Sequence, residues 1–446
     1  MSSKFWRFAS RLCAIAVAVA GAGAPAGLAH AASADAHTGL PAARFWEAIA
    51  IEASELPGFF GAARGDLALL ACGAECTLIP WQLDERDAGG RLVLDQGPAP
   101  DADDPPDVLD ANDIVLFMAS DAGERAPMDP DATLASAPGV SAAVEIEISD
   151  PRTAQRAWAY LVRRAGPAPP AYVHYDAASD RITCARVALG FERGTPRYLA
   201  PVQPAGQPGD NWLDRMKIRA TARFLWGLIS VTRTEDDIQA QLVAWRRGPI
   251  RVIRRQRLWV RLAWGWRTPI LASEAFFYRD FAELPVRFRL NFPPRLLFTD
   301  VAIRAALDFR ELSGWDLETS GSRRRLRVDG RMAAEKLALS RQAGEWFALH
   351  GPATTLVEAL ALSPSLASLQ PRLYYREGRA EDDWPESERG EMPGIGFSLN
   401  RWNHVDRGEH WFASNSYALP PEQGVTEFMA TLQQPLRVTV RPYPSH

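Results

Sequence analysis

The sequence predicts an all-β protein, and two observations support this fold class. Short segments of alternating apolar and polar residues recur along the chain, for example at 142–149 and 285–292. This period of two is typical of antiparallel strands with one buried and one solvated face. Helical patterns are scarce, and the absence of a glycine-rich strand-to-helix motif weighs against nucleotide-binding α/β folds. We expect a small antiparallel β-sandwich, then a larger many-stranded β-sandwich domain with few short helices.

The first 31 residues have the pattern of a signal peptide that is removed after export. Lys4, Arg7 and Arg11 form a basic start, an apolar run follows, and the sequence AHA at 29–31 supplies a cleavage pattern. No later segment is long and apolar enough to predict a helix that crosses a membrane. We therefore expect export by a Sec signal to the periplasm or the extracellular space, with no transmembrane segment after cleavage.

Charged residues are unevenly distributed along the chain. The sequence carries 50 Lys and Arg against 54 Asp and Glu, and removal of the three basic residues of the signal leaves 47 against 54. Residues 81–131 hold fourteen acidic residues and three arginines, whereas 210–310 hold nineteen basic and ten acidic residues. This asymmetry predicts two domains. An exported, acidic chain is a poor candidate for binding nucleic acid.

The predicted domain plan follows from these patterns and from one proline-rich segment. After the signal peptide at 1–31, we expect an acidic N-terminal β-sandwich domain at 32–165. The sequence around 166–172 is rich in proline, as interdomain linkers often are. The larger β-rich domain then takes 173–446.

In the first domain, residues 67–83 have the pattern of a β-hairpin with Gly73 in its turn and a cysteine on each side. A disulfide between Cys72 and Cys76 would close this turn, and disulfides persist in oxidising compartments. Free thiols or a metal-binding pair are the alternatives, although two cysteines with three residues between them are a poor zinc signal without a second ligand pair. Cys184 would then be a buried, unpaired thiol.

Seven aspartates between positions 101 and 121 surround the apolar run at 114–118. Carboxylate oxygens suit calcium, and the candidate ligands in and before this stretch are Asp84, Asp87, Asp110 and Asp113. The spacing departs from an EF-hand, because the glycine and the terminal glutamate of that loop are missing. The alternative is an Asx-type turn at 110–113 that leads into a strand, with a solvated loop before it.

The segments IPWQLDERD at 79–87 and DANDIVLFMASDAGER at 110–125 support a resemblance. Together they resemble the lead segment of β-sandwich domains in bacterial rhamnogalacturonan-lyase-like and related uncharacterised polysaccharide-degradation proteins. The resemblance covers about a tenth of the chain and implies a β-sandwich with a role in glycan degradation. It departs from that pattern at 88–90, where Ala-Gly-Gly stands in place of a calcium loop, and it includes no catalytic residue.

In the larger domain, the strand pattern is clearest at 285–292, where apolar residues alternate with arginine and asparagine, and it recurs at 435–443. The better helical patterns lie at 331–342 and 354–369. Residues 210–229 fit either a helix or a curved strand.

Two segments of the larger domain contain groups suited to catalysis. Arg233 precedes three carboxylates at 235–237, which either supply a general acid and base or form a solvated turn. Residues 400–412 contain two histidines that either transfer protons or bind metal, or else flank a hairpin turn. The predicted roles are a base at Tyr175 or His404, a further catalytic group at His410, charge neutralisation by Arg233, and sugar stacking on Trp402 and Trp411.

The leading functional hypothesis is an exported protein that binds or processes a glycan, by lyase or hydrolase chemistry if it is an enzyme. The alternatives are a non-catalytic periplasmic or envelope interaction protein, and a binder of apolar ligands in a β-lined cavity. Catalysis requires His404, His410 and Arg233 to converge in one concave pocket with nearby carboxylates. Docking to a partner predicts no such pocket, and instead a flat exposed patch of apolar and arginine side chains.

Overall fold

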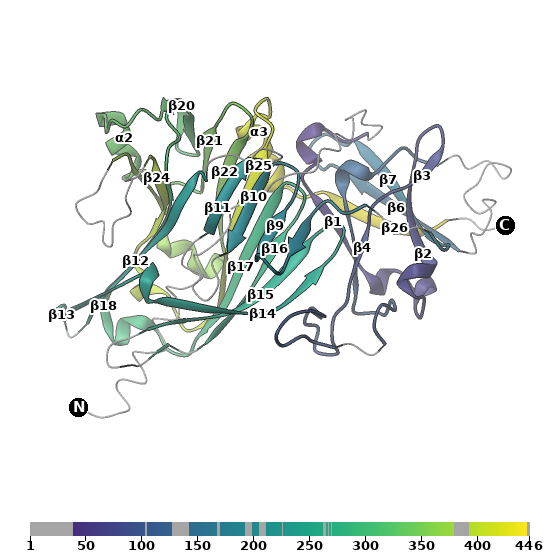
Figure 1. The fold of residues 1–446 in the computed structure, drawn as a ribbon, viewed down its shortest axis with the longest axis horizontal. Helices are drawn as coiled ribbons and strands as arrows, with labels where there is room; N and C mark the ends of the chain where they lie inside the picture. Colours follow the sequence, from purple (N-terminus) through teal and green to yellow (C-terminus); the bar gives the residue numbers. More distant parts are fainter. Residues whose placement is uncertain are drawn as a thin grey trace. The chain divides into compact units, whose positions relative to one another are not determined.

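Figure 1 shows a computed structural model of the protein, in which strands dominate and the few helices are short. The structure describes residues 39–443 except 103–104, 127–141, 167–169, 192–198, 205–210, 225, 262–264, 266, 269 and 379–391. The predicted signal peptide at 1–31 and part of the predicted linker at 166–172 lie outside the described residues. The all-β prediction is confirmed: the strands form five antiparallel sheets of three to nine strands.

The chain divides into two compact units, and the division is not sequential. The larger unit takes Tyr175–Val243 and Ile253–Glu422. The smaller unit takes the described residues up to His174, the hairpin tip Ala244–Val252, and the chain from Gln423 onward. The C-terminal segment, which the strand pattern alone assigned to the larger domain, therefore belongs to the smaller unit.

The smaller unit contains a three-stranded and a five-stranded sheet. The first has the order β1 (Ala48–Glu52), β5 (Ile114–Met118), β4 (Gln82–Asp84). The second has the order β26 (Arg437–Pro442), β6 (Ala143–Ser149), β7 (Arg156–Arg163), β2 (Leu67–Cys72), β3 (Cys76–Leu78). Apolar side chains of both sheets, among them Ile51, Phe117, Leu69 and Leu161, form one buried core, so this unit is a β-sandwich.

A buried arginine ties the C-terminal segment to the start of the smaller unit. Arg44 ends the short 3-10 helix η2 (Ala42–Arg44), and its guanidinium lies 2.6 Å from the Asp150 carboxylate. The same group donates to the carbonyls of Thr431 at 2.7 Å and Gln434 at 2.8 Å, at the end of helix α3 (Val425–Leu432). Because these carbonyls at a helix end lack intrahelical partners, the arginine satisfies them while neutralising Asp150.

The larger unit contains three sheets. A four-stranded sheet has the order β11 (Leu199–Pro204), β10 (Val187–Phe191), β9 (Arg181–Thr183), β8 (His174–Asp176). A five-stranded sheet has the order β13 (Ile229–Thr234), β12 (Leu213–Phe224), β18 (Phe298–Phe309), β24 (Gly394–Leu399), β23 (Arg372–Arg376). A nine-stranded sheet has the order β14 (Ile238–Arg247), β15 (Val252–Val260), β16 (Leu271–Phe277), β17 (Phe281–Leu290), β25 (Gly408–Leu419), β22 (Thr355–Leu362), β21 (Trp346–His350), β19 (Asp316–Thr319), β20 (Ser322–Arg327).

The five-stranded and nine-stranded sheets pack face to face through apolar side chains. Met216 and Ile218 of β12 and Ala305 of β18 share a buried cluster with Ile238 of β14 and Leu258 of β15. This arrangement is the expected many-stranded sandwich.

The structure corrects one predicted helix of this unit, decides between two alternatives for a second segment, and contains a second predicted helix in shorter form. Residues 354–369, predicted as a helix, form strand β22 and the 3-10 helix η11 (Pro364–Leu369). β22 pairs with β21 and β25. Its sequence TLVEALAL is apolar except at Thr355 and Glu358, and a short run of this kind cannot be told from a buried helix by periodicity. Residues 210–229 contain a strand, β12, with two irregularities in its pairing to β18. The helix predicted at 331–342 exists as the short α2 (Ala334–Leu339).

Candidate functional site

The most unusual surface of the larger unit lies at the turn between β12 and β13. Trp226 and Leu228 flank Gly227 in this turn, and their side chains are 88% and 84% exposed. Exposed Ile229 follows in β13, and Leu296 of the 3-10 helix η10 (Pro294–Leu296) is 70% exposed. We call these four side chains (Trp226, Leu228, Ile229 and Leu296) the apolar tip. In Figure 1 the hairpin lies at the lower left of the larger unit, beside the labels β13 and β18.

Paired strands hold the hairpin that carries the apolar tip. β12 and β13 pair without a break from Arg219–Thr234 to Phe224–Ile229. β12 also pairs along its length with β18, as far as Phe224 opposite Phe298, whose rings meet edge to face at 6.2 Å. At the turn itself, Gly227 has φ +89° and Trp226 has φ +59°. A positive φ is unusual for a tryptophan, and such strained positions cluster at functional surfaces.

Charged residues of neighbouring segments lie next to the apolar tip. Thr299 connects the hairpin to these segments. Its hydroxyl donates to the carbonyl of Arg223 at 3.3 Å, and its carbonyl accepts from the side-chain amide of Asn403 at 2.9 Å. Asn403 belongs to the 3-10 helix η12 (Trp402–His404), and Arg295 of η10 pairs with Asp406 just beyond it at 2.8 Å. We call the exposed arginines of these segments the arginine rim: Arg223, Arg295, Arg401 and Arg407.

Of the predicted site residues, His404 is the one that lies on this surface. It is exposed at the end of η12, between Arg401 and Arg407 in the chain. Trp402 is a correction: expected as a sugar platform, it is fully buried and packs against Phe288 and Phe412. Trp411 is 42% exposed on β25 and so remains available for contact.

His410 forms a serine–histidine arrangement that the sequence did not suggest. Its Nδ1 lies 2.9 Å from the hydroxyl of Ser365, and its Nε2 lies 3.0 Å from the backbone carbonyl of Asp406. A carbonyl only accepts, so Nε2 carries the proton in the neutral ring and Nδ1 accepts from Ser365. The ring of His410 is buried against Phe288, with centroids 5.3 Å apart, whereas Ser365 is exposed. The exposed serine hydroxyl and the imidazole are thus hydrogen-bonded to each other, and the Asp406 carbonyl holds the far side of the ring.

Arg233 and Tyr175 are not part of that arrangement. Arg233 lies in β13 and donates to the neighbouring carbonyl of Thr232 at 2.9 Å. Within the described part of the chain, no hydrogen bond or ion pair joins it to His404 or His410. Tyr175 is buried and donates to Asp180 at 2.7 Å, and burial together with this carboxylate raises the pKa of Tyr175 above its ordinary value. A buried phenol of this kind is a poor base, so the convergent pocket expected for catalysis is not found among these residues.

The carboxylates that follow Arg233 are structural. Glu235 is fully buried, accepts the backbone N–H of Ile218 at 2.9 Å and pairs with Arg219 at 2.7 Å. Asp237 accepts the backbone N–H of Thr234 at 3.1 Å in a capping box. They therefore fix the start of β14 and leave no free acid–base pair.

The four predicted calcium ligands all make contacts within the smaller unit. Asp84 pairs with Arg251 at 2.7 Å, and Asp87 pairs with Arg91 at 2.7 Å. Asp110 accepts the N–H of Asn112 and Asp113 that of Asp110, both at 2.9 Å, which is the expected Asx-type turn. Among the described residues, no three His, Cys, Asp or Glu side chains are grouped as metal ligands. These four carboxylates thus act as turn and ion-pair partners in this structure.

The cysteine predictions for the hairpin are confirmed. Cys72 and Cys76 form a disulfide across the β2–β3 turn. Cys184 is a free, buried thiol whose sulfur contacts the carbonyl of Tyr278 at 2.7 Å, and burial raises its pKa. A thiol in such surroundings is inert.

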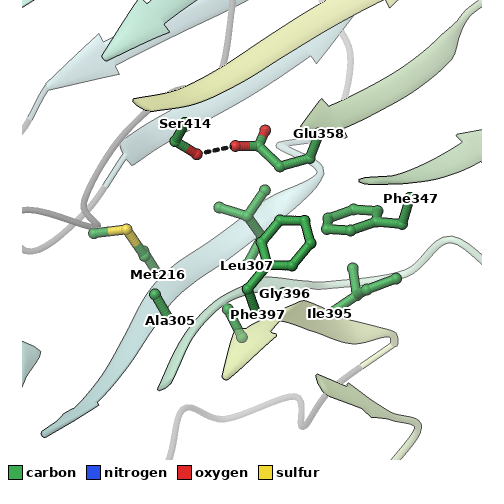
Figure 2. Close-up of a pocket in the computed structure, with 10 residues that line it drawn as sticks. Met216, Ala305, Leu307, Phe347, Glu358, Ile395, Gly396, Phe397 and Ser414 are labelled. Atoms are coloured by element: carbon green, nitrogen blue, oxygen red, sulfur yellow. Dashed lines mark hydrogen bonds between the residues drawn. The ribbon is translucent and has the colours of Figure 1, made fainter. Parts of the chain in front are cut away.

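A small cavity lies between the two large sheets of the larger unit, with Glu358 at its edge (Figure 2). Its volume of about 30 Å³ gives room for roughly two water molecules. Glu358 of β22 accepts hydrogen bonds from Ser414 and Ser416 of β25. Apolar side chains such as Leu307, Phe347 and Phe397 form most of the other walls. Burial raises the pKa of Glu358 to about 7, and the two hydroxyls offset this only in part.

The sequence analysis did not identify Glu358, because this residue lies in the apolar run of 355–362, which the sequence predicted to be helical. The single acidic residue in that run was the signal that could have found it. The cavity is too small for a sugar or a lipid, so it does not support a ligand-binding cavity of that kind.

Comparisons with known proteins give a distant likeness. No protein-family model matches the chain, and no curated protein matches it. A solved structure of a protein in glycosyl hydrolase family 38 from Enterococcus faecalis has 8% sequence identity and a TM-score of 0.45, over 90% of this chain and 46% of that one. An alpha-mannosidase from Enterococcus faecalis V583 has 10% identity and a TM-score of 0.37, over 69% and 39%. This chain thus spans less than half of either protein, and at such identity and TM-score their activity is not carried over.

The helices give no sign of a membrane span. None that the structure describes is long and apolar enough to cross a membrane.

Proposed function

We propose that this protein is an exported envelope interaction protein that docks to its partner surface through the apolar tip of the larger unit. The observation that carries this proposal is the exposure of Trp226 and Leu228, at 88% and 84%, at the turn of one hairpin. Single exposed apolar residues are ordinary on protein surfaces, whereas a cluster of large ones marks an interaction site. The arginine rim beside it adds arginine side chains to the apolar ones, as expected for docking, but on a hairpin turn in place of the flat patch that the sequence analysis expected.

The exposed side chains of the apolar tip forgo the free energy that burial would give them. Each large apolar side chain gains about 1.5–3 kcal/mol when it moves from water into an apolar environment. Trp226, Leu228 and Leu296 obtain little of this in the chain alone, since each is at least 70% exposed. A partner that covers them would gain it, and tryptophan is among the residues that dominate binding energy at interfaces.

The test is retention on isolated envelopes of cells that export the protein. The variant Trp226→Ser/Leu228→Ser should lose most of the binding of the natural chain. The matched control is Leu337→Ser, which removes a leucine of α2 that is 52% exposed and lies outside the tip. Equal retention of all three proteins would rule out docking through the tip.

A second candidate function rests on the Ser365–His410 hydrogen bond. An exposed hydroxyl that donates to an oriented imidazole suits attack on an acyl carbonyl. With the glycan role implied by the sequence resemblance, the corresponding activity is hydrolysis of an acyl ester carried on a glycan. Trp411 follows His410 in β25 and points to the other face of the sheet, so it is not placed to stack on the same substrate.

A further inference from the structure

We propose that the partner surface of the apolar tip is a lipid layer with anionic headgroups, into whose interface the tip inserts. This inference rests on the docking function proposed above and identifies the partner.

The shape of the tip favours a fluid partner over a flat protein surface. Trp226 and Leu228 lie in the turn of a hairpin and are almost completely exposed. To cover such projecting side chains, a protein needs a groove of matching depth, whereas a lipid interface closes around any convex shape. The strand pairing of β12 with both β13 and β18 holds the turn in place during insertion.

The chemistry of the apex matches the membrane interface. Tryptophan is enriched where headgroups meet acyl chains, because one part of its ring is apolar and its N–H is polar. Leu228, Ile229 and Leu296 are purely apolar and suit the region just below the headgroups. The acidic residues that follow the turn along the chain lie in η8 (Glu235–Asp237) at the far end of β13, and Asp300 of β18 stands opposite Arg223, not at the apex.

The charges around the tip favour anionic headgroups. The four arginines of the rim stand against Asp300 and Asp406, which leaves two positive charges. Arg289 and Glu409, at the facing ends of β17 and β25, pair with each other at 3.6 Å and cancel. Basic residues at a membrane surface attract anionic lipid over about a Debye length, so salt should weaken the attraction.

The experiment measures sedimentation of the purified protein with vesicles of phosphatidylcholine alone and of phosphatidylcholine with phosphatidylglycerol at about 3:1. We expect binding to the anionic vesicles, a loss of roughly tenfold or more in Trp226→Ser/Leu228→Ser, and no change in Leu337→Ser. Arg223→Gln/Arg295→Gln should reduce binding to anionic vesicles and leave any binding to neutral vesicles unchanged. As a second measurement, an environment-sensitive dye on Leu228→Cys should shift to the blue with vesicles, and the same dye on Leu337→Cys should not.

The outcomes separate this inference from the docking function. Loss of envelope retention in the tip variant without any vesicle binding by the natural chain would overturn the lipid partner and leave docking to an envelope protein. Vesicle binding that is equal in the natural chain and the tip variant would also overturn it. If the tip variant is retained on envelopes as well as the natural chain, the docking function itself fails.

Discussion

Asp84 and Arg251 form a buried ion pair: Nη2 of Arg251 lies 2.7 Å from Oδ2 of an aspartate that is fully buried. Gln82 completes the arrangement, because its amide donates to Asp84 at 2.6 Å and its carbonyl accepts the backbone N–H groups of Ile250 and Arg251. An aspartate that the sequence offered as a metal ligand is thus the anchor of a hairpin tip from a distant part of the chain.

The first prediction concerns this anchor. Asp84→Asn leaves the buried guanidinium of Arg251 without its counter-charge, and breaking such a pair typically costs about 3–5 kcal/mol. We expect that loss in the free energy of unfolding of the smaller unit, measured by denaturant titration. Asp87→Asn is the matched control, since its partner Arg91 is mostly exposed, and it should change stability little. Equal effects of the two substitutions would contradict the anchoring role.

The second prediction concerns Glu358 and pH. Its pKa is about 7 in the folded protein and 4.5 ordinarily. Between these values the native state holds a proton that the unfolded chain has released, so stability falls as pH rises through this window. The contribution is on the order of 3 kcal/mol. Glu358→Gln should therefore stabilise the larger unit at about pH 8 relative to the natural chain, and much less at about pH 4.

The readout for Glu358 is the difference in the free energy of unfolding between Glu358→Gln and the natural chain, measured by denaturant titration across pH. The comparison between variant and natural chain is needed because burial also raises the pKa of Asp113 to about 6. This carboxyl group therefore also lowers stability as pH rises, but in the smaller unit. Glu409→Gln, at an exposed position of β25, is the control. A difference that does not change with pH would show that Glu358 does not titrate in this range.

The third prediction concerns Ser365. If His410 activates its hydroxyl, a fluorophosphonate probe should label Ser365, as identified by peptide mass spectrometry, and His410→Gln should slow labelling by at least about tenfold. The hydroxyl of Ser363 lies 2.9 Å from that of Ser365, and among the described residues no hydrogen bond joins it to His410, so Ser363→Ala should retain labelling. Absence of label on Ser365 in the folded protein would remove the hydrolase candidate.

The fourth prediction concerns calcium. The carboxylates of Asp84, Asp87, Asp110 and Asp113 already accept from arginines or backbone N–H groups. We expect the thermal unfolding midpoint to be the same in EDTA and in millimolar calcium. A reversible rise with calcium would show that the native state binds the ion, and would reopen the acidic stretch as a metal site.

The sequence predicted several strands because apolar and polar residues alternate along them, and the burial of β17 and β26 follows that alternation. The segment 285–292 lies largely within β17, 142–149 within β6 and 435–443 around β26. It failed at β22, because the run TLVEALAL is almost entirely apolar and its residue types do not alternate. The disulfide was predictable because only three residues lie between its cysteines along the chain.

The candidate surface could not be predicted because its residues are distant in sequence. The run FLWGLI at 224–229 has the composition of a buried segment, and only the hairpin geometry shows that Trp226 and Leu228 lie in its turn. In the same way Trp402 and Trp411 look alike in sequence, yet one is core and the other partly exposed. Ser365 and His410 are 45 positions apart and meet because β22, η11 and β25 are neighbours.

The measurement that tests the docking function most directly is site-specific photo-crosslinking in cells that export the protein. A photoreactive amino acid replaces Trp226 in one variant and Leu337 in the other, and the adducts of the two are compared after irradiation. Docking through the apolar tip predicts abundant adducts with envelope components at position 226 and few at 337. Equally few adducts at both positions, in a protein that is exported and folded, would contradict it.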